Sequence, residues 1–345
     1  MSEGQIDAEA GPLAPPAIAL VEEPDPAPVS QIRAKPVLVT GASGLVGTHT
    51  CRALAARGWK IRALIRDRAK AAARLAGLPV ELVTADIRDH DALVTALRGT
   101  SAVVHLAAIA IERRGQSYEA VNAAATSTVL DATREAGVAR FVHMSQNGAS
   151  SGSSSGFLRS KGIAEDLVRA SALEWTVLRP SVIVGPEDEF VNVLARLVRL
   201  TPVIFPLPGG GRSRFQPIAV RDVAQAVSIA LDRPTTIRGV YGIGGPAALT
   251  LREMTERILT AMRARRVIIG VSVSVLRPLI AIAARVLPNP PVTPSLLDLL
   301  DVDNAVPDNA ITQTFGIQPT PFAPEELTYL RAISARDALR SLFTR

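Results

Sequence analysis

A glycine-rich turn between an apolar strand and a helix constrains this chain more than any other feature. Residues 36–47 read Pro-Val-Leu-Val-Thr-Gly-Ala-Ser-Gly-Leu-Val-Gly, so a short apolar run leads straight into Gly41, Gly44 and Gly47. We expect Gly41 to form a tight turn, Gly44 to let the backbone approach a pyrophosphate, and Gly47 to let the next helix pack closely on the sheet. That helix is predicted over residues 45–57, with its N-terminal amides and positive dipole end toward the phosphates.

A second apolar strand is predicted at residues 60–65, where a βαβ unit requires one. Strand, glycine turn, helix and strand together predict dinucleotide binding, and the alternation continues along the chain. Further helices are predicted at residues 68–76, 90–97, 117–136 and 158–172, and further strands at 80–84, 102–106, 141–145 and 176–178. The expected fold class is α/β, a doubly wound parallel sheet of the Rossmann type with a smaller C-terminal α/β lobe.

Composition and pattern divide the chain into three parts. Residues 1–34 carry six prolines, six acidic residues, one basic residue and no aromatic residue. Such a segment buries too little apolar surface to offset its ordering entropy, which predicts a disordered tail. Residues 35–180 are predicted to form the Rossmann domain. Residues 181–345 are predicted to form the C-terminal lobe, with parts of 215–245 returning to the Rossmann core.

The sequence also disfavours several localisations and partners. The N-terminal segment is acidic and has no long apolar stretch, unlike a signal peptide or a mitochondrial presequence, so we expect a cytoplasmic protein. No nucleic-acid motif or aromatic platform accompanies the net charge of +6, so no nucleic-acid partner is expected. The four histidines are scattered, which gives a metal site little support. The single cysteine, Cys51, falls in the first helix and is predicted to be buried.

The spacing Gly-x-x-Gly-x-x-Gly after Thr40 resembles the short-chain dehydrogenase/reductase superfamily, in its extended and atypical, epimerase/dehydratase-like branches. The resemblance continues through residues 83–88 and 103–108. It implies that Asp86 lies beside the adenine and that Ala107 and Ala108 leave room for the adenosine ribose. The cofactor-binding residues predicted in this way are Thr40, Gly41, Ser43, Gly44, Leu45, Val46, Gly47, Arg66, Asp86, Ile87, Leu106, Ala107, Ala108, Lys161 and Pro180.

The end of the second strand bears on which nicotinamide cofactor is bound. An acidic residue there hydrogen-bonds the ribose 2′-hydroxyl of NAD, whereas an arginine accepts the 2′-phosphate of NADP. The chain reads Leu-Ile-Arg-Asp-Arg over residues 64–68, which places Arg66 at the discriminating position. Arg62 and Arg68 are close by, and Asp67 would reverse the choice if the strand ended one residue later. NADP(H) is therefore favoured over NAD(H).

The superfamily's catalytic pair, a tyrosine four residues before a lysine, is incomplete here. None of the three tyrosines, Tyr118, Tyr241 and Tyr329, has a lysine at that distance. The matching stretch is Phe157-Leu-Arg-Ser-Lys161, in which Phe157 fills the tyrosine position but has no proton to transfer. Lys161 is predicted to bind the nicotinamide ribose. Ser145, at the end of a strand, is either a substrate or nicotinamide contact or a strand-end cap.

Later segments resemble one branch in particular, the nucleotide-binding accessory subunit of respiratory complex I and its bacterial relatives. The similar segments are residues 178–190, 208–217 and 220–224. The resemblance implies that Pro180 lines the nicotinamide end and that Asp222 stabilises the junction with the lobe. Glycines 209–211 either present Arg212 and Arg214 to an anion or form a plain surface turn.

Residues 267–287 are nearly all apolar and follow three arginines between 263 and 266. Arg277-Pro278 interrupts the segment midway, so a membrane-spanning helix is not expected. Its second half places apolar residues on one helical stripe: Leu276, Leu279, Ile280, Ala283, Val286 and Leu287. This stripe is typical of a core helix of the lobe. It is also typical of a helix in residues 263–287 that contacts a membrane surface or a respiratory complex, which would place the protein at the inner face of the membrane.

Three functions remain open. The first is an NADP(H)-holding structural or redox-sensing subunit with little turnover, which Phe157 and the resemblance to the complex I subunit favour. The second is an NADPH-dependent oxidoreductase acting on a lipophilic or quinone-like substrate, because hydride transfer depends chiefly on positioning. The third is a nucleotide-sugar epimerase or dehydratase, which is disfavoured because such chemistry needs the missing phenol.

Overall fold

The computed structural model describes residues 33–112, 115–292, 297 and 303–343. Apart from Arg33 and Ala34, the tail predicted to be disordered lies outside the described residues. Arg33 itself is ordered by Asp232, to which it donates a hydrogen bond of 3.2 Å, and its guanidinium lies 5.8 Å from the centre of the Trp59 ring.

A seven-stranded parallel sheet forms the centre of the protein, with the strand order β11-β6-β5-β4-β1-β2-β3. The chain therefore runs outward from β1 to one edge and then returns to build the other half. The strands are β1 Val37–Thr40, β2 Ile61–Ile65, β3 Val80–Thr84, β4 Ala102–His105, β5 Arg140–Met144, β6 Glu174–Pro180 and β11 Gly239–Ile243. The apolar runs of β1, β2, β4, β5 and β6 are buried on both faces, as a sheet covered by helices requires, whereas the edge strands β3 and β11 are only partly covered.

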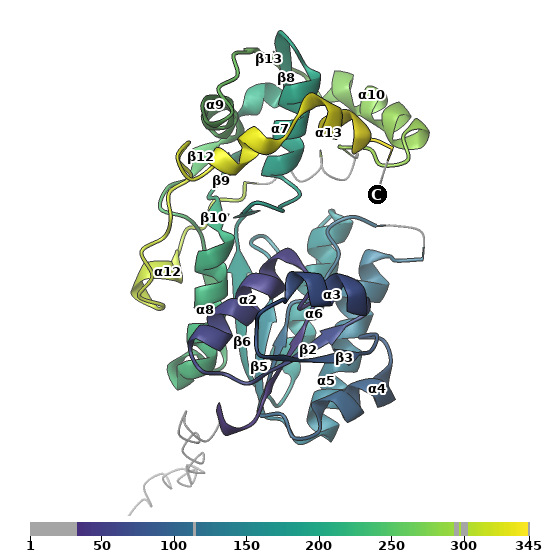
Figure 1. Ribbon diagram of the computed structural model, residues 1–345, viewed down its shortest axis with the longest axis vertical. Coiled ribbons are helices and arrows are strands. Elements are labelled where there is room, and N and C mark those ends of the chain that lie inside the picture. Colours follow the sequence, from purple (N-terminus) through teal and green to yellow (C-terminus); the bar gives the residue numbers. More distant parts are fainter. Residues whose placement is uncertain (1–32, 113–114, 293–296, 298–302, 344–345) are drawn as a thin grey trace, which may run out of the picture.

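Three helices cover each face of this sheet (Figure 1). On one side pack α2 Leu45–Ala56, α3 Arg68–Arg74 and α8 Val220–Asp232. On the other pack α4 His90–Leu97, α5 Ala125–Glu135 and α6 Gly156–Ala170. The predicted α/β fold class is confirmed.

The helix predicted at residues 117–136 differs from expectation at its start. Residues Glu119–Ala124 form a π-helical segment, and the α-helix α5 begins only at Ala125. The wider turn brings the Asn122 side chain onto the loop after β4, where it accepts a 2.8 Å hydrogen bond from the Ile109 amide and donates one of 3.1 Å to Ser160. π-Helical turns of this kind often mark functional sites.

The C-terminal lobe is built on short strand pairs and four α-helices, seen at the top of Figure 1. The pairs are β7 Ile183–Val184 with β10 Ile218–Ala219, β9 Arg214–Phe215 with β12 Leu249–Thr250, and β8 Ile204–Pro208 with β13 Val267–Val271. The helices α7 Val191–Leu200 and α9 Leu251–Ala261 share an apolar core with Phe205 and Leu330. Helix α10 Val273–Val286 contributes no buried residue, and the short helix α13 Ala335–Arg340 buries Ala338.

The apolar segment at residues 267–287 is therefore a strand followed by a helix. Arg277-Pro278 interrupts the apolar run but not the helix, because α10 continues through Pro278. Pro278 lies on the sixth residue of the helix, where it removes one backbone hydrogen bond without ending the helix. No helix among the described residues is long and apolar enough to cross a membrane.

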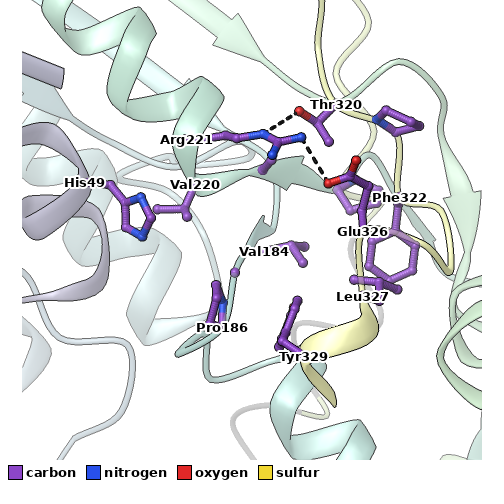
Figure 2. A pocket seen from close by; sticks show the side chains of 14 residues that line it. His49, Val184, Pro186, Val220, Arg221, Thr320, Phe322, Glu326, Leu327 and Tyr329 are labelled. Atoms are coloured by element: carbon purple, nitrogen blue, oxygen red, sulfur yellow. Dashed lines mark hydrogen bonds and ion pairs between the residues drawn. The ribbon is translucent and has the colours of Figure 1, made fainter. Parts of the chain in front are cut away.

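The C-terminal segment ties the lobe back to the sheet at the first turn of α8. Asp222 accepts hydrogen bonds from the Thr320 amide at 2.7 Å and from its hydroxyl at 3.2 Å. Figure 2 shows Arg221 bonded to Thr320 and Glu326 beside a cavity of about 250 Å³, which His49 of α2 also lines. No residue that the sequence predicted for cofactor binding lines this junction cavity.

Candidate dinucleotide-binding site

A second cavity, of about 220 Å³, opens where the carboxyl ends of β1, β2, β3 and β4 meet. In open α/β sheets this edge is where ligands bind. Many of the predicted cofactor-binding residues line it: Gly41, Ser43, Gly44, Arg66, Asp86, Ile87, Leu106, Ala107 and Ala108. Lys70 of α3 also lines it, a contribution that the sequence did not predict.

The three glycines have the distinct environments that their predicted roles require. Gly41 has a φ of +68°, and a Cβ there would lie 2.8 Å from the Ala107 amide nitrogen. A Cβ on Gly47 would lie 2.1 Å from the Gly41 carbonyl oxygen, so the helix approaches the turn as closely as only glycine allows. A Cβ on Gly44 would meet only that carbonyl, at 3.2 Å, and Gly44 otherwise borders the open cavity.

Helix α2 begins directly at this cavity without a cap. Gly44 precedes it with no side-chain hydrogen bond, and its first turn carries no acidic residue. Leu45 and Val46 supply the first amides of the helix. An uncapped helix N-terminus offers unsatisfied N–H groups and a partial positive charge, a combination that suits a phosphate.

Thr40 joins the glycine turn to the neighbouring strand. Its hydroxyl accepts hydrogen bonds from the Leu106 and Ala107 amides, at 3.2 and 3.3 Å, and lies 2.8 Å from His105 Nδ1. His105 Nε2 lies 3.0 Å from the Thr126 hydroxyl, which itself donates to a backbone carbonyl. We therefore assign the proton of His105 to Nε2, so that Nδ1 accepts from Thr40. Burial, and secondarily the charge of Lys161, lowers the pKa of His105 to about 3, so the imidazole is neutral.

The charges at the end of β2 are arranged by the start of α3. Asp67 caps α3, because its carboxylate accepts a 2.9 Å hydrogen bond from the Lys70 amide. Arg66 is exposed and lines the cavity, whereas Asp67 does not line it. Arg62 points elsewhere, to Glu81 at 2.8 Å and to two backbone carbonyls. Of the four charged residues between positions 62 and 68, Arg66 alone borders the cavity.

Asp86 carries its negative charge at the same cavity. Arg88 binds both of its carboxylate oxygens, at 2.9 and 2.7 Å, and this pairing lowers the pKa of Asp86 to about 2. Asp86 is therefore ionised at neutral pH, and it remains at the position where the family resemblance places an acid beside the adenine.

Lys161 lies on the second turn of α6, almost completely buried. Its ammonium donates a 2.5 Å hydrogen bond to the Met144 carbonyl at the end of β5. Burial lowers the pKa of Lys161 to about 8, and the opposing effect of Glu165 is smaller. Pro180 ends β6, which lies next to β5 in the sheet and two strands from β4. Lys161 and Pro180 therefore lie at the edge of the sheet along which a nicotinamide would extend from the glycine turn.

Ser145 faces a buried acid that the sequence analysis did not single out. Its hydroxyl donates a 2.8 Å hydrogen bond to Glu165, and Arg179 binds both oxygens of the same carboxylate, at 2.8 and 2.6 Å. Ser145 would have to leave Glu165 to reach a substrate, so the geometry favours the structural alternative for this residue.

Phe157 lies in the first turn of α6, one turn before Lys161, and is half-buried. Its ring meets the ring of Tyr118 edge-on, with the centroids 5.7 Å apart. The Tyr118 hydroxyl donates to the Ala110 carbonyl at 2.9 Å, and burial raises the pKa of Tyr118. A phenol is thus present beside the phenylalanine, but it is protonated and engaged with the backbone.

Two histidines that are far apart in the sequence meet under this edge of the sheet. His105 and His143 are partners on β4 and β5, and their rings stack with centroids 5.5 Å apart. His143 is buried with neither ring nitrogen hydrogen-bonded, and burial keeps its pKa well below the usual range. Only the strand register brings this pair together, so the spacing of the histidines gave no signal of it.

The sequence profile of the NAD dependent epimerase/dehydratase family matches residues 37–244, the stretch that contains all of these side chains. The chain belongs to this family. Its members bind a nicotinamide dinucleotide, so the predicted family and the predicted class of cofactor are confirmed.

Individual relatives include the branch that the sequence predicted. The mitochondrial NADH dehydrogenase (ubiquinone) 1 alpha subcomplex subunit 9 of Arabidopsis thaliana is 31% identical over 231 residues, which are 65% of this chain and 57% of that protein. The ceramide reductase of Caulobacter vibrioides is 35% identical over 188 residues, 54% of this chain and 58% of that protein. The chain thus spans less than two thirds of the length of either relative.

Solved structures agree on the fold. The NADPH-dependent quinone oxidoreductase QOR2 of Escherichia coli, solved with NADPH, superposes with a TM-score of 0.67 at 21% identity. The superposition covers 85% of this chain and 99% of that one. At this level of identity the likeness establishes the architecture alone.

Proposed function

We propose that this protein binds NADP(H) and turns over little or no substrate, acting as a structural or redox-sensing subunit of the complex I accessory type. The observation that carries this proposal is Phe157, which stands one turn before the buried Lys161. In the family's catalytic arrangement that position holds the phenol that exchanges a proton with the substrate. Phenylalanine preserves the packing and removes the proton.

The residues around the cavity fit the cofactor part by part. Gly44 and the uncapped start of α2 would hold the pyrophosphate, and Ala107 and Ala108 leave room for the adenosine ribose. Asp86 and Ile87 would flank the adenine. Lys161 would hold the nicotinamide ribose, for which its ammonium must leave the Met144 carbonyl or share its protons with it. When bound, the cofactor supplies a hydride; the chain supplies position and charge.

The preference for NADP(H) rests on Arg66. Because Asp67 is occupied as the cap of α3, the only charge from this segment at the cavity is positive. A guanidinium pairs well with a phosphate and has no acceptor for a ribose hydroxyl proton. Lys70 adds a second cation at the same wall.

Replacing Arg66 by Ala tests this preference. We expect NADPH binding to weaken by about 1.5–3 kcal/mol, the usual strength of a charge-assisted contact, while NADH binding is unchanged. Isothermal titration of both cofactors measures the two losses separately. Arg68→Ala is the matched control, because Arg68 does not line the cavity. Equal losses for NADPH and NADH in Arg66→Ala would contradict the assignment.

The low turnover is tested on the unmodified protein and on Phe157→Tyr. NADPH absorbance with ketones, quinones and nucleotide sugars should stay constant for the natural chain, although titration shows the cofactor bound. Phe157→Tyr restores a phenol one turn before Lys161 and should introduce slow carbonyl reduction. Brisk reduction or epimerisation by the unmodified chain, lost in Lys161→Met, would overturn the proposal.

A second candidate is an NADPH-dependent reductase of a lipophilic or quinone-like substrate. Two observations favour it: the similarity to a protein named ceramide reductase, and the Tyr118 phenol against Phe157. Tyr118 keeps its proton at neutral pH because burial raises its pKa, so it could donate to a reduced carbonyl oxygen after leaving Ala110. Activity that survives Lys161→Met and disappears in Tyr118→Phe would select this candidate.

The proposal also covers the limits of the two domains and the surface that the protein contacts. We assign residues 35–180 to the Rossmann domain and 181–345 to the lobe, with 215–245 partly in the core. The similarity to a mitochondrial NADH dehydrogenase subunit supports a peripheral protein that contacts a membrane or a respiratory complex through residues 263–287.

A further inference from the structure

Helix α10 is apolar yet uncovered. It spans Val273–Val286, and none of its residues is buried. Its side chains form two adjacent stripes with helical spacing. The inner stripe, half-buried, consists of Leu276, Ile280 and Ala283, and Leu287 continues it just after the helix. The outer stripe is exposed and consists of Val275, Leu279, Ile282 and Val286. The stripe predicted from the sequence mixed the two, because Leu279 and Val286 face solvent whereas its other members pack inward.

The outer stripe is not an ordinary scatter of surface apolar residues. Its four side chains are 57%, 60%, 62% and 73% exposed, and they follow one another at intervals of four, three and four residues. All large exposed apolar side chains among the described residues lie between positions 203 and 343. The other six are Val203, Ile204, Val267, Ile269, Leu339 and Phe343. The helices around the seven-stranded sheet contribute none, so the exposed apolar surface is concentrated on the lobe.

The charges that flank α10 in the sequence have one sign. From Arg257 to Leu297 the sequence contains six arginines and no acidic residue. Two of the arginines are bound to backbone carbonyls: Arg257 to Phe322, and Arg266 to Thr201 and Val198. Arg263 and Arg265 are exposed immediately before β13, and Arg285 is exposed in the last turn of α10. An exposed apolar stripe with flanking exposed arginines is complementary to an anionic, partly apolar surface.

We propose, building on the membrane contact proposed above for residues 263–287, that α10 docks this end of the protein on an anionic lipid surface, with the outer stripe inserted at the boundary between headgroups and acyl chains. Helices that lie in this boundary combine an apolar face with basic flanks. A helix of fourteen residues is about 21 Å long, shorter than the hydrocarbon core of about 30 Å, so it lies on the membrane and does not cross it. The arginines would contact lipid phosphates, and the adjoining exposed Ser272 and Ser274 add no charge.

Vesicle flotation of the full chain tests this inference. We expect binding to vesicles of phosphatidylcholine mixed with phosphatidylglycerol, weaker binding to phosphatidylcholine alone, and a loss of binding as salt concentration rises. The double variant Leu279→Gln/Ile282→Gln should lower the partition coefficient on the order of tenfold or more, since both side chains lose their burial in lipid. Val203→Gln/Ile204→Gln removes two comparably exposed apolar side chains from β8 and its preceding residue, which lie outside α10, so it should lower the partition coefficient much less.

Each other outcome contradicts the inference. Absence of binding to anionic vesicles would overturn it, as would equal losses in the two double variants. A dimer in sedimentation that Leu279→Gln/Ile282→Gln dissociates, without vesicle binding, would assign the stripe to a second copy. Thermal unfolding of both variants checks that they fold. Because docking does not depend on the cofactor, failure to bind vesicles and failure to bind NADPH are separate results.

Discussion

Lys161 is a cation held almost out of contact with water, and this has a consequence for stability. Burial lowers its pKa from the ordinary 10.5 to about 8. Below pH 8 both the folded and the unfolded chain carry the proton, so the penalty for burying the charge is fully present. Between pH 8 and 10.5 the folded state releases its proton first. The unfolded state then binds more protons, and stability rises with pH by up to about 1.4 kcal/mol per unit.

Urea unfolding of the natural protein and of Lys161→Met across this range checks the prediction. The free energy of unfolding of the natural protein, minus that of the variant, should rise between pH 8 and 10.5. Burial also raises the pKa of Cys51 to about 12, which lowers stability above pH 9, but this contribution is common to both proteins and cancels. Lys70→Met, which removes an exposed lysine, is the control. A level difference for Lys161→Met would show that the ammonium is hydrated.

The surroundings of a residue were predicted well where the backbone conformation determines them. They were predicted less well where they depend on the position of a neighbouring side chain. Gly41, Gly44 and Gly47 have the environments expected from spacing alone. The environment of Arg66 depends on Asp67, whose carboxylate could have faced either the cavity or the amide of Lys70. Glu165 lies twenty residues from Ser145, and only the fold shows that the two are bonded.

At the scale of elements, two glycines in the turn from β1 to α2 have different roles: Gly47 is needed for stability and Gly44 for cofactor binding. A Cβ at Gly47 would lie 2.1 Å from the Gly41 carbonyl oxygen, whereas one at Gly44 meets no atom closer than 3.2 Å. Gly47→Ala should therefore destabilise the protein by roughly 1–3 kcal/mol through overpacking. Gly44→Val should cost stability no more than about 1 kcal/mol as a poorer N-cap, yet it should abolish NADPH binding.

Thermal unfolding without cofactor and NADPH titration distinguish the two variants. Gly47→Ala should lower the melting temperature and retain NADPH binding. Gly44→Val should change the melting temperature little and lose NADPH binding. If Gly44→Val binds NADPH normally, the pyrophosphate does not lie over the glycine turn.

The strands and helices of the sheet were predictable because each apolar run is short and bounded by a turn residue. Strand β3 and helix α4 have the expected limits, and the strands predicted at residues 60–65, 102–106, 141–145 and 176–178 begin and end within two residues of expectation. Strand β11 was not predicted as a strand, although parts of residues 215–245 were expected in the core. The π-helical start of α5 was not predictable, since its wider turn follows from packing against α6 and the loop after β4. The periodicity of α10 predicted a helix with an apolar stripe but could not indicate which side the lobe covers.

At the scale of the whole molecule, the lobe was the least predictable part. Its strands are two to five residues long and pair across large separations, as β8 at Ile204 does with β13 at Val267. Such pairs leave no local pattern. Its attachments are likewise distant in sequence: Asp222 with Thr320, and Arg221 with Glu326.

A further ion pair, between Arg74 and Glu187, joins the helices of the sheet to the lobe beside the candidate cofactor site. Arg74, at the end of α3, donates to the Ser43 carbonyl in the glycine turn at 3.2 Å and pairs with Glu187 of the lobe at 2.6 Å. The pair is substantially exposed, so it should contribute only about 0.2–1 kcal/mol to stability. Its effect should instead appear in cofactor binding, because it steadies the turn on which the pyrophosphate would lie.

Replacing Glu187 by Gln releases Arg74 from the lobe and should weaken NADPH and NADH binding equally, by less than about tenfold. The equality follows because the pyrophosphate is common to both cofactors, in contrast to the NADPH-specific loss expected for Arg66→Ala. Hydrogen exchange at residues 41–47 should become faster in the variant without cofactor. Asp131→Asn, which breaks a more exposed pair with Arg134 on α5, is the control and should change neither quantity. A loss confined to NADPH would mean that Arg74 acts at the 2′-phosphate and not through the turn.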